Sequence, residues 1–488
     1  MTDARLQRKQ TFNIALITFW SNFASYGLNT ILILFLTNSA LEHGLGYTQA
    51  HAYAFMGVSH ATGALMPILG GYMADQVLGL RRSILLGSIL LALAYLLIML
   101  SGMSIAAHGD ILFLMAYAIT PAVGSLLVGS ALVSHIYQDE EVNAKSAMTY
   151  YYMAINVGAL LATVIAPSLL ESRYGPLSVL ALSFMGKAIA ALNFSARYKL
   201  YNNVVQGKDA RPMSKVQIVK IIWYVLSIYS FTLFVFLHVE MAGILIGIGC
   251  LLGIAWFLYQ TFALQGIVRL KQCIAILLIV EAIVFFVIYN QMNTTLILFA
   301  KDNAHNQLFG IAFSPAQYQL LNPLLIIGIG FYLPTFYRKF PSFTIPYQFA
   351  AGTILASLAL VGLGCAPAGA GSLVNAGYLA LTYVCITLAE LWVSAIGLSM
   401  IGLYCDVRIL GFAMGAWYLA SSLSSLCSGY IAHWVALPTY KIAPLLSLEI
   451  YQTYYWYLGM VMLGFGGLML LNAYGLQRWF QRRGLRLA

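Results

Sequence analysis

Four ionisable side chains lie well inside long apolar runs of this sequence, namely His60, Lys187, Glu281 and Glu390. They are the residues at which chemistry is most expected. An ionisable group in apolar surroundings is expensive unless it is paired or wetted, so each is a candidate functional residue. Glu390 is the best candidate, because a carboxylate can bind an amine and the protonated acid can carry a proton. The alternative for Glu390 is a purely structural, hydrogen-bonding role.

The other three residues leave alternatives open. Glu281 is either a second proton site or a solvated residue facing a cytoplasmic vestibule. His60 can titrate near neutral pH, but a lone histidine in a helix is more often a hydrogen-bonded packing residue. Lys187 lies about 15 Å from the end of its run at helical rise, too far to reach water easily. It is either paired with a carboxylate or buried neutral, and we favour a structural pair.

Neutral polar side chains accompany these groups within the apolar runs: Asn22, Asn29, Asn156, Asn290, Gln291, Asn322 and Ser394. Amides can recognise peptide-like groups by hydrogen bonds without the cost of a charge. They also link helices within membranes, so a structural role is equally expected for any one of them.

The sequence shows no pattern typical of an enzyme. It has no phosphate-binding glycine loop, no His-x-x-x-His pair and no nucleophile elbow. The six cysteines are scattered through apolar runs, so we expect neither disulfides nor a metal site. No cofactor is expected, apart from a proton as a possible coupling ion.

The composition indicates that the elements holding these residues lie in lipid. Apolar residues make up 61% of the 488-residue chain and charged residues 8%. A helix needs about 20 mostly apolar residues to cross the hydrocarbon core of a bilayer. The first run is too long for a cleaved signal peptide, so we expect it to remain as a helix. The runs predict fourteen membrane-spanning helices, at 12–38, 50–75, 82–102, 111–137, 146–170, 177–197, 216–237, 241–264, 272–300, 316–337, 346–366, 374–402, 409–436 and 449–477.

The basic residues orient this map. The ends of the predicted helices lie alternately on the side of the N-terminus and on the opposite side. Of the 25 Lys and Arg residues, 21 fall on the side of the N-terminus. Three fall on the opposite side, Arg173, Lys301 and Lys441, and Lys187 lies within a run. Basic residues concentrate on the cytoplasmic side of membrane proteins, which places both termini in the cytoplasm. The net charge of +10 therefore reflects topology, and we expect no nucleic-acid binding.

The order of the runs suggests two halves. The most polar internal stretch, 198–215, follows six predicted helices. Two further helices at 216–264 precede a last group of six at 272–477, which leaves 12–197 as the first group. Secondary transporters often consist of two six-helix halves with a site at their interface.

One loop resembles the signature of the major facilitator superfamily. It reads Gly70-Gly71-Tyr72-Met73-Ala74-Asp75-Gln76-Val77-Leu78-Gly79-Leu80-Arg81-Arg82. The glycines permit close helix contact, and Asp75 can accept hydrogen bonds from an Arg or a helix N-terminus. We expect Asp75, Arg81 and Arg82 to latch a cytoplasmic gate.

Further patches resemble the proton-coupled oligopeptide transporter family within that superfamily. They are Phe23-Ala24-Ser25-Tyr26-Gly27, Tyr151-Tyr152-Met153-Ala154-Ile155-Asn156, Gln291-Met292-Asn293-Thr294-Thr295, Asn322-Pro323-Leu324, Glu390-Leu391-Trp392-Val393-Ser394 and Met414-Gly415-Ala416-Trp417. The resemblance runs through most of the chain. It implies a major facilitator fold of two six-helix bundles, and the two extra central helices match bacterial members.

The resemblance also implies proton-driven uptake of small peptides through a central cavity. Its cavity positions persist here as Tyr26, Asn156, Asn322, Glu390 and Trp417. The family's first-helix Glu-x-x-Glu-Arg motif, however, reads Thr18, Ser21 and Asn22, and the next Arg of that helix reads Asn29. The fourth-helix Lys falls at Thr120 or Pro121, and the seventh-helix Glu at Asn290.

These losses shape our expectation for the substrate. Because the cationic carboxylate clamps are missing and an acid remains, the cavity should favour solutes with an amine or a neutral polar surface. The expected solute-binding set is Tyr26, Asn29, Asn156, Asn290, Gln291, Asn322, Glu390, Ser394 and Trp417. The proton-coupling set is Glu390, Glu281 and His60.

Other functions remain open alternatives. A carrier for another small solute, such as an amino acid, nucleoside or amine, could have altered or absent proton coupling. A membrane-embedded enzyme or a channel fits less well, because no polar cluster lies at a membrane edge and the two halves do not form a pore ring. We therefore expect a monomeric, multi-pass carrier of the cytoplasmic membrane, with lipid and a small solute as its partners.

Overall fold

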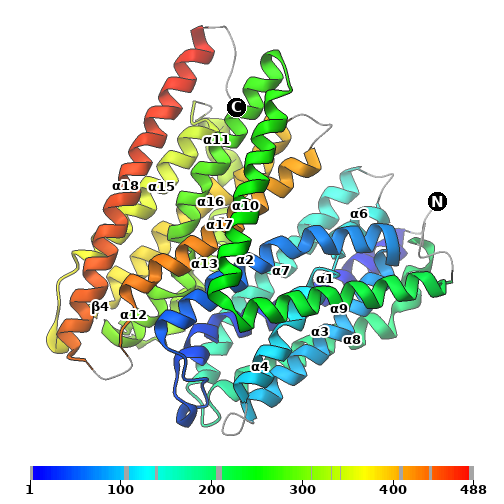
Figure 1. The fold of residues 1–488 in the computed structure, drawn as a ribbon, viewed down its shortest axis with the longest axis horizontal. Helices are drawn as coiled ribbons and strands as arrows, with labels where there is room; N and C mark the ends of the chain where they lie inside the picture. Colours follow the sequence, from blue (N-terminus) through cyan, green and yellow to red (C-terminus); the bar gives the residue numbers. More distant parts are fainter. Residues whose placement is uncertain are drawn as a thin grey trace. The chain divides into compact units, whose positions relative to one another are not determined.

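The computed structural model describes residues 4–103, 109–137, 141–204, 212–308, 310–330, 332–340, 342–405, 410–438 and 442–482. These residues are almost entirely helical (Figure 1). Twelve helices of the described part are long and apolar enough to cross a membrane. The prediction of an all-α membrane protein is therefore confirmed, while the count of fourteen spans stays a prediction.

The chain divides into two compact units. The first consists of Met1–Tyr47 and Leu65–Ala242, and the second of Thr48–Ala64 and Gly243–Ala488. The helix α2 (Gln49–Met73) contributes its first part to the second unit and its last part to the first. The predicted pair of extra helices is likewise divided, because α9 (Lys215–Leu237) belongs to the first unit and most of α10 (Val239–Phe262) to the second.

The other elements of the first unit are α1 (Ala4–Thr37), η1 (Ala40–Glu42), the π-helical turn η2 (Ala74–Leu78), α3 (Leu80–Met103), α4 (Gly109–Tyr117), α5 (Ile119–Gly124), α6 (Gly129–Ile136), α7 (Glu141–Leu170), α8 (Pro176–Ala196) and the 3-10 turn η3 (Tyr198–Val204). The helix α1 packs between α7 and α8. Close approach depends on small residues, since a Cβ at Gly158 would lie 2.7 Å from the Phe19 carbonyl oxygen. Small residues allow this kind of tight packing between membrane helices.

The predicted helix at 111–137 is broken into α4, α5 and α6. Pro121 lies in α5 and has no N–H to continue a helical ladder, so a break near it is expected. The carbonyl of Ala118, at the break, accepts a hydrogen bond of 2.7 Å from the Thr232 hydroxyl on α9. The neighbouring helix thus satisfies backbone that the break exposes, as an apolar environment requires.

The second unit contains, besides α10, the elements α11 (Gly266–Tyr289), η5 (Asn290–Asn293), α12 (Thr295–Asn303), β1 (Ala304–His305), β2 (Gln307–Leu308), β3 (Ile311–Ala312), η6 (Pro315–Leu320), α13 (Leu321–Gly330), α14 (Leu333–Lys339), α15 (Ile345–Gly364), η7 (Ala370–Ser372), β4 (Val374–Asn375), α16 (Ala376–Tyr404), α17 (Leu410–Ala432), η9 (His433–Val435) and α18 (Pro444–Arg482). Strands β1 and β4 pair in parallel, and β2 and β3 form an antiparallel pair. The predicted helix at 316–337 is instead the succession η6, α13 and α14.

Glycines set the closest helix contacts of this unit. A Cβ at Gly364 on α15 would lie 2.7 Å from the backbone nitrogen of Trp456 on α18. A Cβ at Gly459 on α18 would lie 2.8 Å from the backbone nitrogen of Val361. The helices α15 and α18, which run side by side in Figure 1, are therefore in backbone-to-backbone contact along their length.

Candidate functional site

Glu390 lies near the middle of α16 and is partly buried. Its carboxylate oxygen Oε2 accepts a hydrogen bond of 2.5 Å from Asn322 Nδ2 at the start of α13. The Tyr289 hydroxyl, at the end of α11, hydrogen bonds to the same carboxylate. Asn322 Nδ2 also donates to the Thr387 hydroxyl, at 3.2 Å. Donors from two other helices therefore orient the carboxylate, which keeps lone pairs for a further donor because an ionised carboxylate can accept about four bonds.

Two more predicted solute-binding residues lie close in sequence to residues of this site. Ser394 follows Glu390 by four residues, so the two share one face of α16, and Ser394 is partly buried. Asn290 directly follows Tyr289, and its Nδ2 lies 3.3 Å from the Ser425 hydroxyl on α17. The structure thus brings Glu390, Asn322 and Tyr289 together, and Tyr289 is the residue that sequence reasoning missed.

Gln291 is fully buried, and its amide is saturated by protein groups. Its Nε2 donates to the Val287 carbonyl at 3.1 Å and to the Ser428 hydroxyl at 2.9 Å. Its Oε1 accepts from Thr295 at 2.8 Å and from Tyr454 at 2.9 Å. Because a primary amide has two N–H groups and two lone pairs, nothing remains for a solute. The structure therefore uses Gln291 to link η5 to α17 and α18, and not as a solute contact.

Trp417 on α17 is only 5% exposed. Its ring packs edge-on against Phe286 of α11, with ring centroids 5.8 Å apart, and against Phe349 of α15 at 6.4 Å. A Cβ at Gly397 of α16 would lie 2.0 Å from the indole ring. The missing side chain at Gly397 therefore makes the room for Trp417, whose ring is a packing element between four helices.

Glu281 and His60 also belong to the second unit. Glu281 on α11 is 5% exposed, and its Oε1 accepts a hydrogen bond of 3.1 Å from Asn472 Nδ2 on α18. It therefore lies in the contact between α11 and α18, with partners different from those of Glu390. His60 lies in α2 and is partly buried. Because Glu281 is buried, it is not the solvated residue of a cytoplasmic vestibule that the sequence left open. Proton coupling through Glu281 or His60 stays a prediction.

The first unit carries the other predicted solute-binding residues. Tyr26 on α1 is 40% exposed, and Asn29 one turn later is partly buried. Asn156 on α7 is partly buried, and its Nδ2 donates to the Tyr152 carbonyl of the same helix at 2.9 Å. Its carbonyl oxygen is not used in that bond.

Lys187 on α8 is 4% exposed, and its ammonium is surrounded by neutral oxygens from α1. Its Nζ donates to the Ser21 carbonyl at 2.8 Å, the Ser21 hydroxyl at 2.9 Å and the Ser25 hydroxyl at 2.7 Å. The Tyr95 ring lies 5.0 Å away. The expected pair with a carboxylate is wrong for the described residues: three acceptors match the three N–H groups of an ammonium. The four-residue spacing of Ser21 and Ser25 was the available signal.

The three predicted gating residues of the signature loop differ in their exposure. Asp75 in η2 is exposed, and Arg82 is partly buried. Arg81 is 9% exposed: its guanidinium hydrogen bonds to Asn202 Oδ1 and lies 4.2 Å from the centroid of the Tyr198 ring. Both partners belong to η3, so Arg81 anchors the segment that follows α8. Gating by Asp75, Arg81 and Arg82 remains a prediction.

The structure can be compared with solved proteins at this point. A crystal structure of tetrameric PepTSo2 superimposes with a TM-score of 0.84 at 24% identity, covering 97% of this chain and 99% of that one. A bacterial homologue of the human drug peptide transporters PepT1 and PepT2 gives a TM-score of 0.80 at 23% identity, with the same coverage. This likeness defines the fold, and the prediction of a major facilitator fold is confirmed. No group of three or more metal-binding side chains occurs within the described ranges.

The spans, the family and the named relatives of the chain show a multi-pass membrane transporter, and not an enzyme. Residues 81–457 match the POT family, and the protein belongs to that family. It is 33% identical over 485 residues to dipeptide and tripeptide permease A of Klebsiella pneumoniae (strain 342), covering 98% of this chain and 94% of that protein. The permease of the same name from Escherichia coli (strain K12) is 31% identical over 483 residues, with 98% and 95% covered. The predicted family is therefore confirmed.

Proposed function

We propose that this protein is a secondary active transporter that moves small peptides or peptide-like solutes across the cytoplasmic membrane by alternating access and proton coupling. Two relatives of nearly equal length are named dipeptide and tripeptide permeases, which supports the peptide as substrate class. The observation that carries the proposal within this chain is the Glu390 carboxylate, partly buried and oriented by Asn322 and Tyr289.

Glu390 has two tasks in this proposal. As a carboxylate it accepts hydrogen bonds from the ammonium group of a solute, and as an acid it holds the coupling proton. Asn322 and Tyr289 are positioning residues, because each donates a hydrogen bond to the ionised form and so fixes where the negative charge lies. Protonation of Glu390 therefore changes the affinity of the site for a solute amine, which couples the proton to the solute.

Uptake into proteoliposomes under an imposed pH gradient tests this assignment. Glu390→Gln keeps the shape of the side chain and removes its charge and its proton, so gradient-driven uptake of a dipeptide should fall to background. Glu240→Gln is the matched control, because Glu240 lies in the first turn of α10 and is exposed. Full gradient-driven uptake by Glu390→Gln would overturn the proton-site assignment.

Counterflow separates binding from coupling. If Glu281 or His60 carries a proton but binds no solute, Glu281→Gln or His60→Gln should lose gradient-driven uptake while keeping exchange of labelled for unlabelled solute. Glu390→Gln should lose both for solutes with an amine. Exchange that is unaffected in Glu390→Gln would remove this residue from the binding site.

The solute is expected to be recognised mainly through its amine. The ammonium of Lys187 is engaged by Ser21 and Ser25 and is 4% exposed, so it offers no charge to a solute carboxylate in this structure. C-terminal amides of dipeptides should therefore compete for uptake at least as well as the free acids. Free acids that compete clearly better would contradict this preference. Amino acids, nucleosides and simple amines belong in the same panel, since uptake of one of these without peptide uptake would identify a carrier for another solute.

Placement in the membrane forms part of the same proposal. Both termini are cytoplasmic, the protein acts as a monomer and a proton is the only coupling species. Single cysteines near residue 5 and residue 478 should react with a membrane-impermeant reagent only after the cells are opened. Labelling of either site in intact cells would contradict the orientation, and a stable oligomer by light scattering would contradict the monomer.

A further inference from the structure

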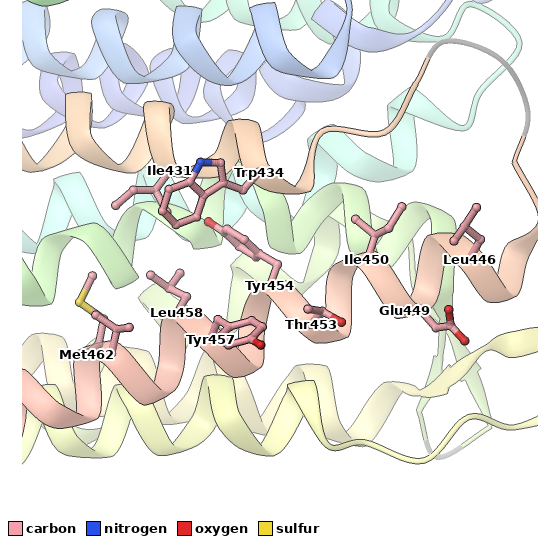
Figure 2. Close-up of a pocket in the computed structure, with 11 residues that line it drawn as sticks. Ile431, Trp434, Leu446, Glu449, Ile450, Thr453, Tyr454, Tyr457, Leu458 and Met462 are labelled. Carbon is pink, nitrogen blue, oxygen red and sulfur yellow. The ribbon is translucent and has the colours of Figure 1, made fainter.

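A groove of about 730 Å³ lies on the second unit, between the end of α17 and the first half of α18. Ile431 and Trp434 form one side, and α18 forms the other from Leu446 to Met462 (Figure 2). The volume is in the range of ligand-binding pockets. None of the proposed solute-binding residues lines it.

The length of the groove fits one leaflet of a bilayer. Leu446 and Met462 are separated by about 24 Å at the helical rise of 1.5 Å per residue. A bilayer including its headgroups is about 40 to 45 Å thick, so one leaflet with headgroup measures roughly 20 to 23 Å. An occupant that lies along the groove can therefore begin at headgroup level and end near the bilayer midplane.

The chemistry along the groove changes in the same direction. The end of the groove toward Met462 is formed by apolar side chains, such as Leu458, Val461 and Met462. The end toward Leu446 carries the carboxylate of Glu449, and no Lys or Arg lines any part of the groove. Trp434, which is 79% exposed, lies between these ends beside Tyr454 and carries an indole N–H donor (Figure 2). Trp and Tyr are typical of the boundary between headgroups and hydrocarbon.

We propose that this groove binds one phospholipid with a primary-amine headgroup, that is, a phosphatidylethanolamine. Glu449 accepts hydrogen bonds from the headgroup ammonium, and the acyl chains cover the apolar floor. A phosphatidylglycerol has no cation for Glu449. A phosphatidylcholine has a cation without N–H donors, so it cannot form the charge-assisted hydrogen bond.

The bound lipid would contact a residue with a second function. The ring of Tyr454 lines the groove, while its hydroxyl donates to Gln291 at 2.9 Å inside the unit. The lipid therefore packs against the ring of Tyr454, whose hydroxyl supplies one of the hydrogen bonds of the Gln291 amide. The site itself does not depend on which solute the protein carries, and it can be tested without transport.

Native mass spectrometry of the delipidated full-length protein tests the proposal. Phosphatidylethanolamine, phosphatidylcholine and phosphatidylglycerol with identical acyl chains are titrated separately. Since an exposed ion pair contributes up to about 1 kcal/mol, we expect phosphatidylethanolamine to bind roughly five-fold more tightly than the other two. Glu449→Gln should abolish this preference, and Glu240→Gln, at the first turn of another spanning helix, should keep it.

A second variant tests the place of the acyl chains. Thr453 is exposed and lines the groove, so Thr453→Trp should fill the groove and weaken all three lipids alike without lowering the melting temperature. Equal affinities for the three lipids in the wild type, an unchanged preference in Glu449→Gln, or unchanged binding in Thr453→Trp would each overturn the proposal.

Discussion

The contact of Lys187 with α1 permits a quantitative test of what holds the first unit together. The Lys187 ammonium donates to the Ser21 hydroxyl at 2.9 Å and to the Ser25 hydroxyl at 2.7 Å, in a site where Lys187 is 4% exposed. Ser21→Ala removes one acceptor from a buried charge. A hydrogen bond to a charged group contributes about 1.5 to 3 kcal/mol, so the free energy of unfolding should fall by that amount.

The same substitution should cost almost nothing once the charge is absent. In a Lys187→Met background the Ser21 hydroxyl has lost its donor, and replacing both partners of a hydrogen bond by apolar groups is often nearly neutral. The double-mutant cycle should therefore give a coupling energy of about 1.5 to 3 kcal/mol between Lys187 and Ser21.

Equilibrium unfolding in mixed SDS and mild detergent measures all four corners of this cycle. Ser88→Ala is the control, because the buried Ser88 hydroxyl bonds to the Leu85 carbonyl of its own helix at 3.0 Å. It should have the same effect with and without Lys187. Equal costs for Ser21→Ala in the two backgrounds would refute the view that the ammonium is held by the hydroxyl.

Three further predictions concern packing and hydrogen bonds. Tyr454→Phe should lower the free energy of unfolding by about 1 kcal/mol, because the hydrogen bond to Gln291 is lost, and Gln291→Leu should lower it further, because several buried hydroxyls lose their partner. Unfolding in SDS measures both changes, and equal changes would contradict the saturated amide of Gln291. Arg81→Lys should increase proteolysis or hydrogen exchange at η3, because a lysine cannot reproduce the guanidinium contacts with Asn202 and Tyr198; unchanged exchange would show that η3 does not depend on Arg81. Gly364→Ala should destabilise the protein by about 1 to 3 kcal/mol through overpacking against the α18 backbone, and an unchanged melting temperature would contradict that contact.

The sequence predicted the membrane fold because its apolar runs have the length that a bilayer demands. It did not predict where those runs break. Pro121 lies inside a continuous apolar run, and hydropathy alone does not register its missing N–H, near which α4 ends and α5 begins. The hydroxyl of Thr232, which satisfies the broken backbone, comes from a helix more than a hundred residues away.

The candidate site was predicted in part. Glu390 and Asn322 were both placed in the solute-binding set, and the two side chains are in direct contact. The side-chain partners of Gln291 and Trp417 could not be read from a pattern, because residue type does not reveal whether an amide or an indole faces a cavity or a neighbouring helix. Both face helices here.

The close fit between Gly397 and Trp417 restricts how related sequences can diverge. An indole occupies the volume in which any side chain at position 397 would begin. Natural homologues that keep this packing should therefore pair glycine at 397 with the large ring at 417, and those with alanine or serine at 397 should carry a smaller residue opposite. The two positions should change together along evolutionary lineages, although twenty residues separate them in the chain.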